Sequence, residues 1–303
     1  MTGGPILRVA VIGAGTMGRG IAQVAAQAGY ATTLFDAAPG VTDRARAEIE
    51  ATLEKGIARG KVTAGQKAVV LDRLRLETDL DRAVADAELV VEAIPERLEL
   101  KRELFRELNA LAPATAILGS NTSSLSIADI AEVMERPDRV LGLHFFNPVH
   151  VMRLVEIVVA PGTAGEVVER VRDFVESLGK RPIVVRDSPG FATSRLGLAL
   201  GLEAMRMMEE GVASVEDIDL AMELGYNHPM GPLKLTDWVG LDVRLAIAEH
   251  LARTIDARRF DPPEVLRRLV AEGKLGRKSG EGFYLWREGE AMPKKWPTKG
   301  SVR

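Results

Sequence analysis

Three closely spaced glycines near the N-terminus limit what this chain can fold into more than any other feature. Residues 6–12 are apolar apart from Arg8 and rich in β-branched side chains, which predicts a buried strand of a parallel sheet. Gly13, Gly15 and Gly18 follow at once, and residues 19–28 are a helical run. Such glycines permit a tight turn, a close approach of the backbone to a pyrophosphate, and close packing of helix on strand. The pattern predicts a dinucleotide-binding strand–helix–strand unit.

A carboxylate completes this pattern. A second strand is predicted over residues 32–35 and ends at Asp36, 23 residues after Gly13. Asp36 would accept hydrogen bonds from the ribose hydroxyls, and its charge would repel a 2′-phosphate. The N-terminus of the helix would favour the phosphates through its unpaired N–H groups and its dipole. We therefore expect the cofactor to be NAD rather than NADP.

Strands and helices alternate as far as residue 187, which predicts a Rossmann-type, doubly wound, mainly parallel sheet. Residues 41–59 and 64–73 are two helices, more than a crossover needs, and we expect them to form an extra helical hairpin. From Ser188 the sequence is helical almost throughout, with one helix expected over residues 233–255. The expected domains are an NAD-binding domain (1–187), an all-helical C-terminal domain for substrate binding and dimerisation (188–286), and a flexible tail (287–303).

Composition excludes several classes of protein. With 303 residues, of which 46% are hydrophobic and 27% charged, the chain suits a globular protein with two domains. A net charge of -3 gives no general attraction to nucleic acid or an anionic membrane, and no apolar run has spanning length. The absence of cysteine excludes disulfides and thiolate sites, and no other metal-ligand cluster is visible. We expect a cytoplasmic protein without metal.

The stretch GLHFFNPVHVMRLVE, residues 142–156, holds two of the four histidines. Its two apolar runs are separated by Asn147-Pro148, which predicts a strand, a turn and a second strand. Neighbouring strands could bring His144 within hydrogen-bond reach of Glu156. A histidine oriented by a carboxylate is a good general base near neutral pH. The alternative is a buried histidine that only forms a structural hydrogen bond to a carboxylate and has no catalytic role.

Two other strand ends carry polar residues. Pro95 ends the strand at residues 89–94, so Glu96 falls at a carboxyl end, where doubly wound sheets bind ligands, and Lys101 follows early on the next helix. Residues 120–124, SNTSS, follow another strand. This loop could face a ligand or merely cap the next helix.

Taken together, the motifs of this sequence resemble those of the L-3-hydroxyacyl-CoA dehydrogenase family, and within it those of the bacterial 3-hydroxybutyryl-CoA dehydrogenases. The resemblance runs from about Val9 to Tyr284. The matching strings are VAVIGAGTMGRGIA, VVEAIPERLELKRELF, SNTSSL, GLHFFNPVHVMRLVE, SPGFATSR, GYNHPMGPLKLTDWVGLD and GRKSGEGFY.

The resemblance implies an NAD-dependent interconversion of (S)-3-hydroxyacyl-CoA and 3-ketoacyl-CoA, with short acyl chains expected. His144 would take the proton of the 3-hydroxyl, Glu156 would orient the imidazole, and Ser123 would hold the substrate oxygen. Coenzyme A contacts would fall on Thr52 and Arg59. The implied cofactor-binding residues are Gly13, Gly15, Gly18, Asp36, Glu96, Lys101, Ser123, Asn147 and Lys278.

Two positions depart from the family pattern. Ser194 stands where an active-site asparagine is expected, and its hydroxyl offers one donor on a shorter arm. A contact from Ser194 to the thioester carbonyl would be weakened or relayed by water. His150 stands where proline is commoner. We interpret it as structural, although it is a rival base because it lies in the same turn as His144.

Two other functions remain open at this point. A related branch of the same fold comprises sugar-acid 3-dehydrogenases, against which the HFFNP string argues. A non-catalytic NAD-binding protein is favoured only by Ser194. The expected partners are an acyl-CoA substrate and a second copy in a homodimer, with neither nucleic acid nor membrane.

Overall fold

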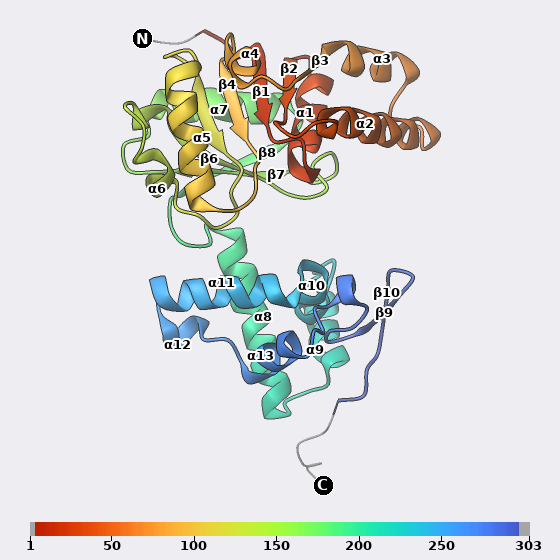
Figure 1. The fold of residues 1–303 in the computed structure, drawn as a ribbon. Helices are drawn as coiled ribbons and strands as arrows, with labels where there is room; N and C mark the ends of the chain where they lie inside the picture. Colours follow the sequence, from red (N-terminus) through yellow and green to blue (C-terminus); the bar gives the residue numbers. More distant parts are fainter. Residues whose placement is uncertain (1–3, 297–303) are drawn as a thin grey trace. The chain divides into compact units, whose positions relative to one another are not determined.

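The computed structural model of the chain describes residues 4–296 (Figure 1). The chain divides into two compact units, Met1–Ser188 and Pro189–Arg303. The division falls one residue after the boundary that the sequence suggests.

The first unit is built on one eight-stranded sheet, whose strand order is β3-β2-β1-β4-β5-β6-β7-β8. The strands are β1 (Arg8–Ile12), β2 (Ala31–Phe35), β3 (Leu74–Glu77), β4 (Leu89–Glu92), β5 (Ile117–Ser120), β6 (Val140–Phe145), β7 (Leu154–Val159) and β8 (Arg181–Arg186). Every neighbouring pair is parallel except β6 and β7, which are antiparallel. The expected doubly wound, mainly parallel sheet is therefore confirmed.

Helices connect these strands. They are α1 (Thr16–Gln27), α2 (Val41–Ala58), α3 (Ala64–Arg73), α4 (Leu80–Val84), α5 (Leu98–Leu111), α6 (Ile127–Ala131), the short η1 (Pro137–Arg139) and α7 (Gly165–Ser177). The chain runs outward from β1 to β3, returns to β4 and then runs the other way. Since such crossovers are right-handed, α1 and α5 lie on opposite faces of the sheet. The reversal between β1 and β4 is where such sheets bind ligands.

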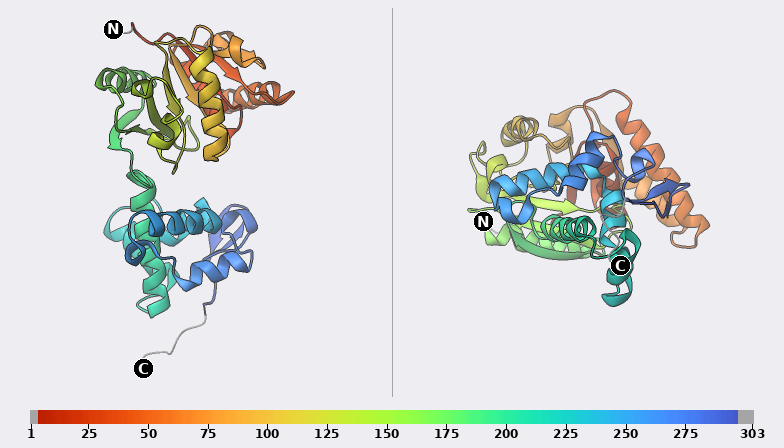
Figure 2. Two further views of the ribbon diagram at one scale, coloured as in Figure 1. Left: turned by 60° about the vertical axis from the view of Figure 1, so that its left-hand side comes forward. Right: turned by 90° about the horizontal axis from the view of Figure 1, so that it is seen from below.

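The extra helical hairpin is α2 and α3, and α2 projects away from the sheet in each view (Figures 1 and 2). The buried side of α2 carries Ile49 and Leu53, both 1% exposed. Thr63 caps α3 by accepting a hydrogen bond from the Gln66 N–H, while the Gln66 side chain accepts one from the Thr63 N–H. These contacts fix the hairpin as an ordered part of the first unit.

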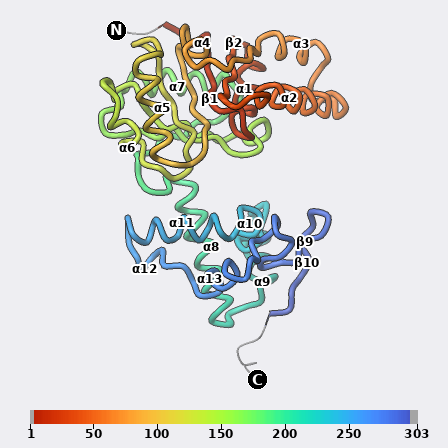
Figure 3. The backbone as a smooth tube through the Cα atoms, viewed as in Figure 1, coloured from red at the N-terminus to blue at the C-terminus, as the bar shows by residue number. Residues whose placement is uncertain are grey.

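The second unit is helical, as expected. Its elements are α8 (Thr193–Glu210), α9 (Val215–Gly225), α10 (Pro232–Val239), α11 (Leu241–Thr254), α12 (Ala257–Phe260), α13 (Glu264–Ala271), the short η2 (Arg277–Ser279), and the strands β9 (Leu285–Arg287) and β10 (Glu290–Met292). Figure 3 follows the backbone through them. Leu198, Leu202 and Met205 on α8 are fully buried in the apolar core of this unit.

Two expectations for this unit are wrong. The helix expected over residues 233–255 is two helices, α10 and α11, because Gly240 between them has φ +106°, which no α-helix accommodates. The tail expected to be flexible from residue 287 is ordered as far as residue 296. Strand β10 pairs with β9, and the indole of Trp296 donates a hydrogen bond to the Phe283 carbonyl at 3.2 Å. Residues 297–303 lie outside the described part of the chain.

Candidate active site

The glycines after β1 shape a loop that has room for a ligand. Gly13 has φ +100°, and a Cβ there would lie 2.7 Å from the Ala93 carbonyl oxygen. A Cβ on Gly18 would lie only 1.6 Å from the Gly13 oxygen, so this position excludes any side chain. A Cβ on Gly15 would meet no atom within 4 Å. Gly13 and Gly18 are therefore required by close contacts within the protein, whereas Gly15 leaves open space beside the start of α1.

A cavity of about 650 Å³ adjoins this loop and extends from Gly13 and Gly15 to Asp36. The carboxylate of Asp36 accepts hydrogen bonds from the Ala14 N–H at 2.9 Å and the Ala38 N–H at 3.0 Å. These bonds fix Asp36 at the end of β2. The cavity, the open space at Gly15 and the placed carboxylate fit a dinucleotide whose phosphates lie at the start of α1.

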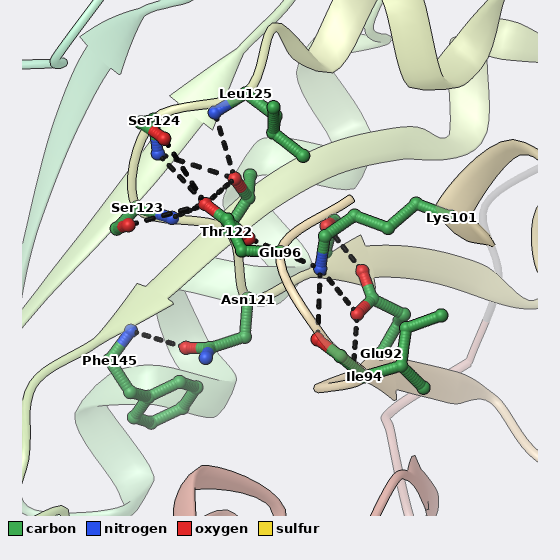
Figure 4. A network of polar contacts seen from close by, with 11 residues as sticks. Glu92, Ile94, Glu96, Lys101, Asn121, Thr122, Ser123, Ser124, Leu125 and Phe145 are labelled. Atoms are coloured by element: carbon green, nitrogen blue, oxygen red, sulfur yellow. Dashed lines mark hydrogen bonds and ion pairs between the residues drawn. The ribbon is translucent and has the colours of Figure 1, made fainter. Parts of the chain in front are cut away.

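A buried polar cluster lies beside this cavity, at the ends of β4 and β5 (Figure 4). Glu92, on β4, is fully buried and accepts hydrogen bonds from the Ile94 N–H at 2.7 Å and the Ser120 hydroxyl at 2.5 Å. Lys101, on α5, is also fully buried, and its Nζ lies 2.6 Å from Glu92 Oε1. The same Nζ lies 3.5 Å from Glu96 Oε2. Lys101 thus contacts carboxylates of the protein and holds the loop after β4 in place.

Glu96 organises the SNTSS loop from the other side. Its Oε1 accepts hydrogen bonds from the Thr122 hydroxyl at 2.6 Å and from the Ser123 N–H at 2.9 Å and hydroxyl at 3.2 Å. Burial alone would raise the pKa of Glu96, but the charge of Lys101 and the hydrogen bonds from Thr122 and Ser123 outweigh it and lower the pKa. Glu96 is therefore an anionic acceptor that positions Ser123.

His144 and Glu156 are directly opposite each other on the antiparallel strands β6 and β7. His144 Nδ1 lies 2.7 Å from Glu156 Oε2, and the two side chains are almost completely buried. With its hydrogen on Nδ1 donated to Glu156, the imidazole keeps Nε2 as the proton acceptor. The predicted strand–turn–strand geometry is confirmed, and it brings together two residues that are twelve positions apart.

A second cavity, of about 350 Å³, brings these features together, since it is lined by residues of all three strand ends. The lining residues include Glu96, Asn121, Ser123, His144 and Asn147. Asn121 Oδ1 accepts a hydrogen bond from the Phe145 N–H at 2.9 Å, which ties the loop after β5 to β6. A bound alcohol could thus contact Ser123 and His144 at once.

His150, the rival base, does not line this cavity. It is exposed and lines two smaller cavities of about 140 Å³ and 290 Å³. Burial and the nearby charge of Lys180 lower its pKa. The structure thus separates His150 from Glu156 and leaves His144 as the histidine paired with a carboxylate.

Four further predicted residues lie on α2 and its C-terminal end or in the second unit. Thr52 lines the 140 Å³ cavity, and its hydroxyl donates to the Glu48 carbonyl at 2.8 Å, while Arg59 is exposed at the end of α2. In the second unit, Ser194 lies in the first turn of α8. Lys278 forms an ion pair with Asp242 there, with Nζ 2.5 Å from Oδ1. The predicted ligand contacts of these four residues stay predictions.

Sequence reasoning missed Glu92 and Lys180. Glu92 was hidden in an apolar strand, although a carboxylate within a buried run is itself a signal of a paired charge. Lys180 is nearly buried, and its Nζ donates to the carbonyls of Val149 at 2.5 Å and Met152 at 2.7 Å. It therefore holds the turn between β6 and β7, which carries Asn147. Nothing in the local sequence links Lys180 to that turn.

Within residues 4–296, no group of three or more potential ligating side chains could hold a metal ion. No helix of that described part is long and apolar enough to cross a membrane.

Comparison with known proteins matches both units to one family. Residues 8–188 match the 3-hydroxyacyl-CoA dehydrogenase, NAD binding domain, and residues 190–286 match the 3-hydroxyacyl-CoA dehydrogenase, C-terminal domain. A probable 3-hydroxybutyryl-CoA dehydrogenase of Deinococcus radiodurans is 44% identical over 280 residues, which cover 92% of this chain and all of the relative.

Two further relatives extend the comparison. A 3-hydroxyadipyl-CoA dehydrogenase of Escherichia coli is 46% identical over 286 residues, or 94% of this chain and 60% of the relative. The crystal structure of an (S)-3-hydroxybutyryl-CoA dehydrogenase from Ralstonia eutropha superposes with a TM-score of 0.90 at 38% identity, covering 93% of this chain and all of that one.

Proposed function

The chain belongs to the 3-hydroxyacyl-CoA dehydrogenase family, and on that premise we propose that it interconverts a short-chain (S)-3-hydroxyacyl-CoA and the 3-ketoacyl-CoA with NAD. The relative from Deinococcus radiodurans, named for 3-hydroxybutyryl-CoA, supports a short acyl chain. The observation that carries the proposal is the buried pair of His144 and Glu156 beside a cavity that Ser123 also lines.

In this proposal His144 Nε2 takes the proton of the substrate's 3-hydroxyl as the hydride leaves C3. Bound NAD supplies the hydride acceptor. Glu156 holds the imidazole in the tautomer that leaves Nε2 unprotonated and stabilises the imidazolium that forms. Ser123, placed by Glu96, holds the substrate oxygen beside His144. In the reverse direction the imidazolium returns the proton to the ketone oxygen.

The choice of NAD over NADP follows from Asp36. Its carboxylate lies at the end of β2 beside the 650 Å³ cavity and is held there by two backbone N–H groups. A fixed negative charge accepts hydrogen bonds from ribose hydroxyls and repels a phosphate on the 2′-oxygen. Gly13, Gly15 and Gly18 would place the pyrophosphate at the start of α1.

Coenzyme A would contact the helical hairpin through the hydroxyl of Thr52 and the guanidinium of Arg59, the two donors that the family resemblance implies. Ser194 would contact the thioester in place of an amide. Asn147 and Lys278 would complete the cofactor contacts.

A homodimer and a cytoplasmic location belong to the same proposal. The large exposed apolar side chains Leu196, Leu224 and Tyr226 of the second unit support the dimer.

The test compares two histidine variants. His144→Gln should lower kcat for acetoacetyl-CoA reduction about 10²- to 10⁴-fold, the range expected for a lost general acid–base, with NADH binding little changed. His150→Gln is the matched control, because this histidine lies in the turn after β6 and outside the cavity, and it should keep near wild-type turnover. Initial rates of NADH oxidation and NADH fluorescence titrations measure both effects.

Equal activity of His144→Gln and the wild type would refute this histidine as the base. A wild type that binds NADH but does not reduce acetoacetyl-CoA would favour a non-catalytic NAD-binding protein. Faster turnover of a 3-keto sugar acid than of acetoacetyl-CoA would favour the sugar-acid branch.

A further inference from the structure

The cofactor cavity of about 650 Å³ adjoins the catalytic residues at one end only. There it shares three lining residues, Met17, Ala93 and Ile94, with the 350 Å³ cavity beside His144. The nicotinamide of a bound NAD belongs at this end, because the hydride is transferred beside His144. The adenosine half of NAD then belongs at the opposite end of the cavity, past the glycine loop and Asp36.

This opposite end lies toward the edge strand β3. The strands are ordered β3-β2-β1-β4, and Asp36 and Leu80 follow the ends of β2 and β3. The lining on this side is apolar and comes from several elements, with the residues Phe35, Val41, Leu80, Pro95 and Leu104. A flat aromatic base removes apolar surface from water in such a place, so this part of the cavity suits the adenine ring.

Glu107 adds a carboxylate to this lining. It lies on α5, which packs against α4, the helix that begins at Leu80. Glu107 follows Leu104 by three positions, so the two side chains are on one face of α5, and both line the cavity. This face of α5 therefore presents an apolar surface and a negative charge to the same ligand.

The carboxylate of Glu107 is exposed and has no partner within the protein. Among residues 4–296, no group donates a hydrogen bond to it and no cation forms an ion pair with it. Asp36, the other carboxylate of the lining, already accepts hydrogen bonds from two backbone N–H groups. Glu107 is thus an acceptor that remains available to a ligand in the apolar part of the cavity.

The edge of an adenine ring offers one strong donor. This donor is the amino group on C6, whereas the unsubstituted ring nitrogens accept hydrogen bonds. An ionised carboxylate only accepts, so on this base it can pair with the amino group alone. A hydrogen bond to a charged acceptor is stronger than one between neutral groups.

We propose that Glu107 is a specificity-determining residue of the cofactor site and accepts a hydrogen bond from the 6-amino group of the adenine of NAD. This inference rests on the proposed function and adds recognition of the base. The glycine loop acts on the pyrophosphate and Asp36 on the ribose, and neither of them distinguishes one base from another.

The experiment measures Kd by fluorescence titration for NADH and for its purine analogue, in which hydrogen replaces the 6-amino group. The wild type should bind NADH about 10-fold more tightly, as expected for one charge-assisted hydrogen bond at an exposed position. Glu107→Ala should bind the two dinucleotides within about 2-fold of each other, with the loss of affinity confined to NADH. Glu107→Gln should keep an intermediate preference, because its amide oxygen still accepts but carries no charge.

The matched control is Glu103→Ala, which removes an exposed carboxylate from the same helix that does not line the cavity. It should keep both wild-type Kd values. Equal binding of the two dinucleotides by the wild type would overturn the inference. A Glu107→Ala variant that loses the same affinity for both, or that keeps the wild-type ratio, would also overturn it.

The two proposals fail in different ways. A wild type that binds neither dinucleotide would defeat the proposed function. Binding and oxidation of NADH with acetoacetyl-CoA, without any preference over the purine analogue in binding, would leave that function in place and defeat only the role of Glu107.

Discussion

Replacing Lys101 with Met tests whether the charge cluster of Glu92, Glu96 and Lys101 contributes both to the stability of the fold and to NADH binding and turnover. Lys101 and Glu92 are each 0% exposed and lie 2.6 Å apart. Methionine fills a similar volume but leaves the Glu92 carboxylate buried without its cation. Glu92 keeps the hydrogen bonds from the Ile94 N–H and the Ser120 hydroxyl. These two bonds offset only part of the lost attraction.

Removing one partner of a buried ion pair costs about 3–5 kcal/mol, because the other charge remains desolvated. We expect Lys101→Met to lower the free energy of unfolding by an amount near the lower end of this range, since the two remaining hydrogen bonds stabilise the carboxylate. Lys101 also lies 3.5 Å from Glu96, which positions Ser123. NADH affinity and turnover should therefore fall as well.

Urea denaturation followed by circular dichroism measures the loss of stability, and NADH titration measures the loss of affinity. Arg106→Met is the control, because it removes an exposed cation from the same helix and should change stability by less than about 0.5 kcal/mol. The double variant Lys101→Met, Glu92→Gln should recover at least about 1 kcal/mol of the loss, since no charge is left buried. A loss no larger than that of Arg106→Met, or no recovery in the double variant, would refute this reasoning.

Two further predictions concern the glycine loop and a buried carboxylate. Gly18→Ala should unfold or strongly destabilise the first unit, because its Cβ would overlap the Gly13 oxygen. Gly15→Ala should leave the urea midpoint unchanged and weaken NADH binding, because its Cβ would meet no atom of the protein. Equal urea midpoints for the two variants would contradict this prediction. Burial raises the folded pKa of Asp237 from 3.8 to about 6, despite hydrogen bonds from Trp286, Phe283 and Tyr284. The folded state therefore holds this proton more tightly, and the contribution of Asp237 to stability falls by about 2–3 kcal/mol as pH rises from 4 to 7. Unfolding free energies of the wild type minus those of Asp237→Asn, measured across that range, should decrease by this amount, and a flat or rising difference would contradict the prediction.

Much of the first unit could be predicted from local sequence. Glycine spacing after an apolar strand is dictated by backbone geometry, so the strand–helix–strand unit and the position of Asp36 at the end of β2 followed directly. The strand pair around Asn147-Pro148 followed from two apolar runs separated by a proline. Because facing positions on antiparallel strands are neighbours, this also predicted that His144 could reach Glu156.

Helix ends and the C-terminal segment were less certain from sequence. Residues 233–255 have a continuous helical pattern, and only the positive φ of Gly240 divides them into α10 and α11. Residues 287–296 are polar and contain proline, a composition typical of a flexible tail, yet β10 pairs with β9 and Trp296 packs on the core. Contacts distant in sequence overrode the local preference in both segments.

The amino-acid sequence by itself determined the doubly wound sheet, the dinucleotide loop and the opposed His144 and Glu156, because each depends on short-range geometry and on the period of apolar residues. Only the tertiary structure decided that Lys101 is buried between two carboxylates and that Lys180 holds the turn carrying Asn147. The energy of a charge depends on how completely the fold removes it from water and on which groups the fold brings beside it, and those neighbours come from distant parts of the chain.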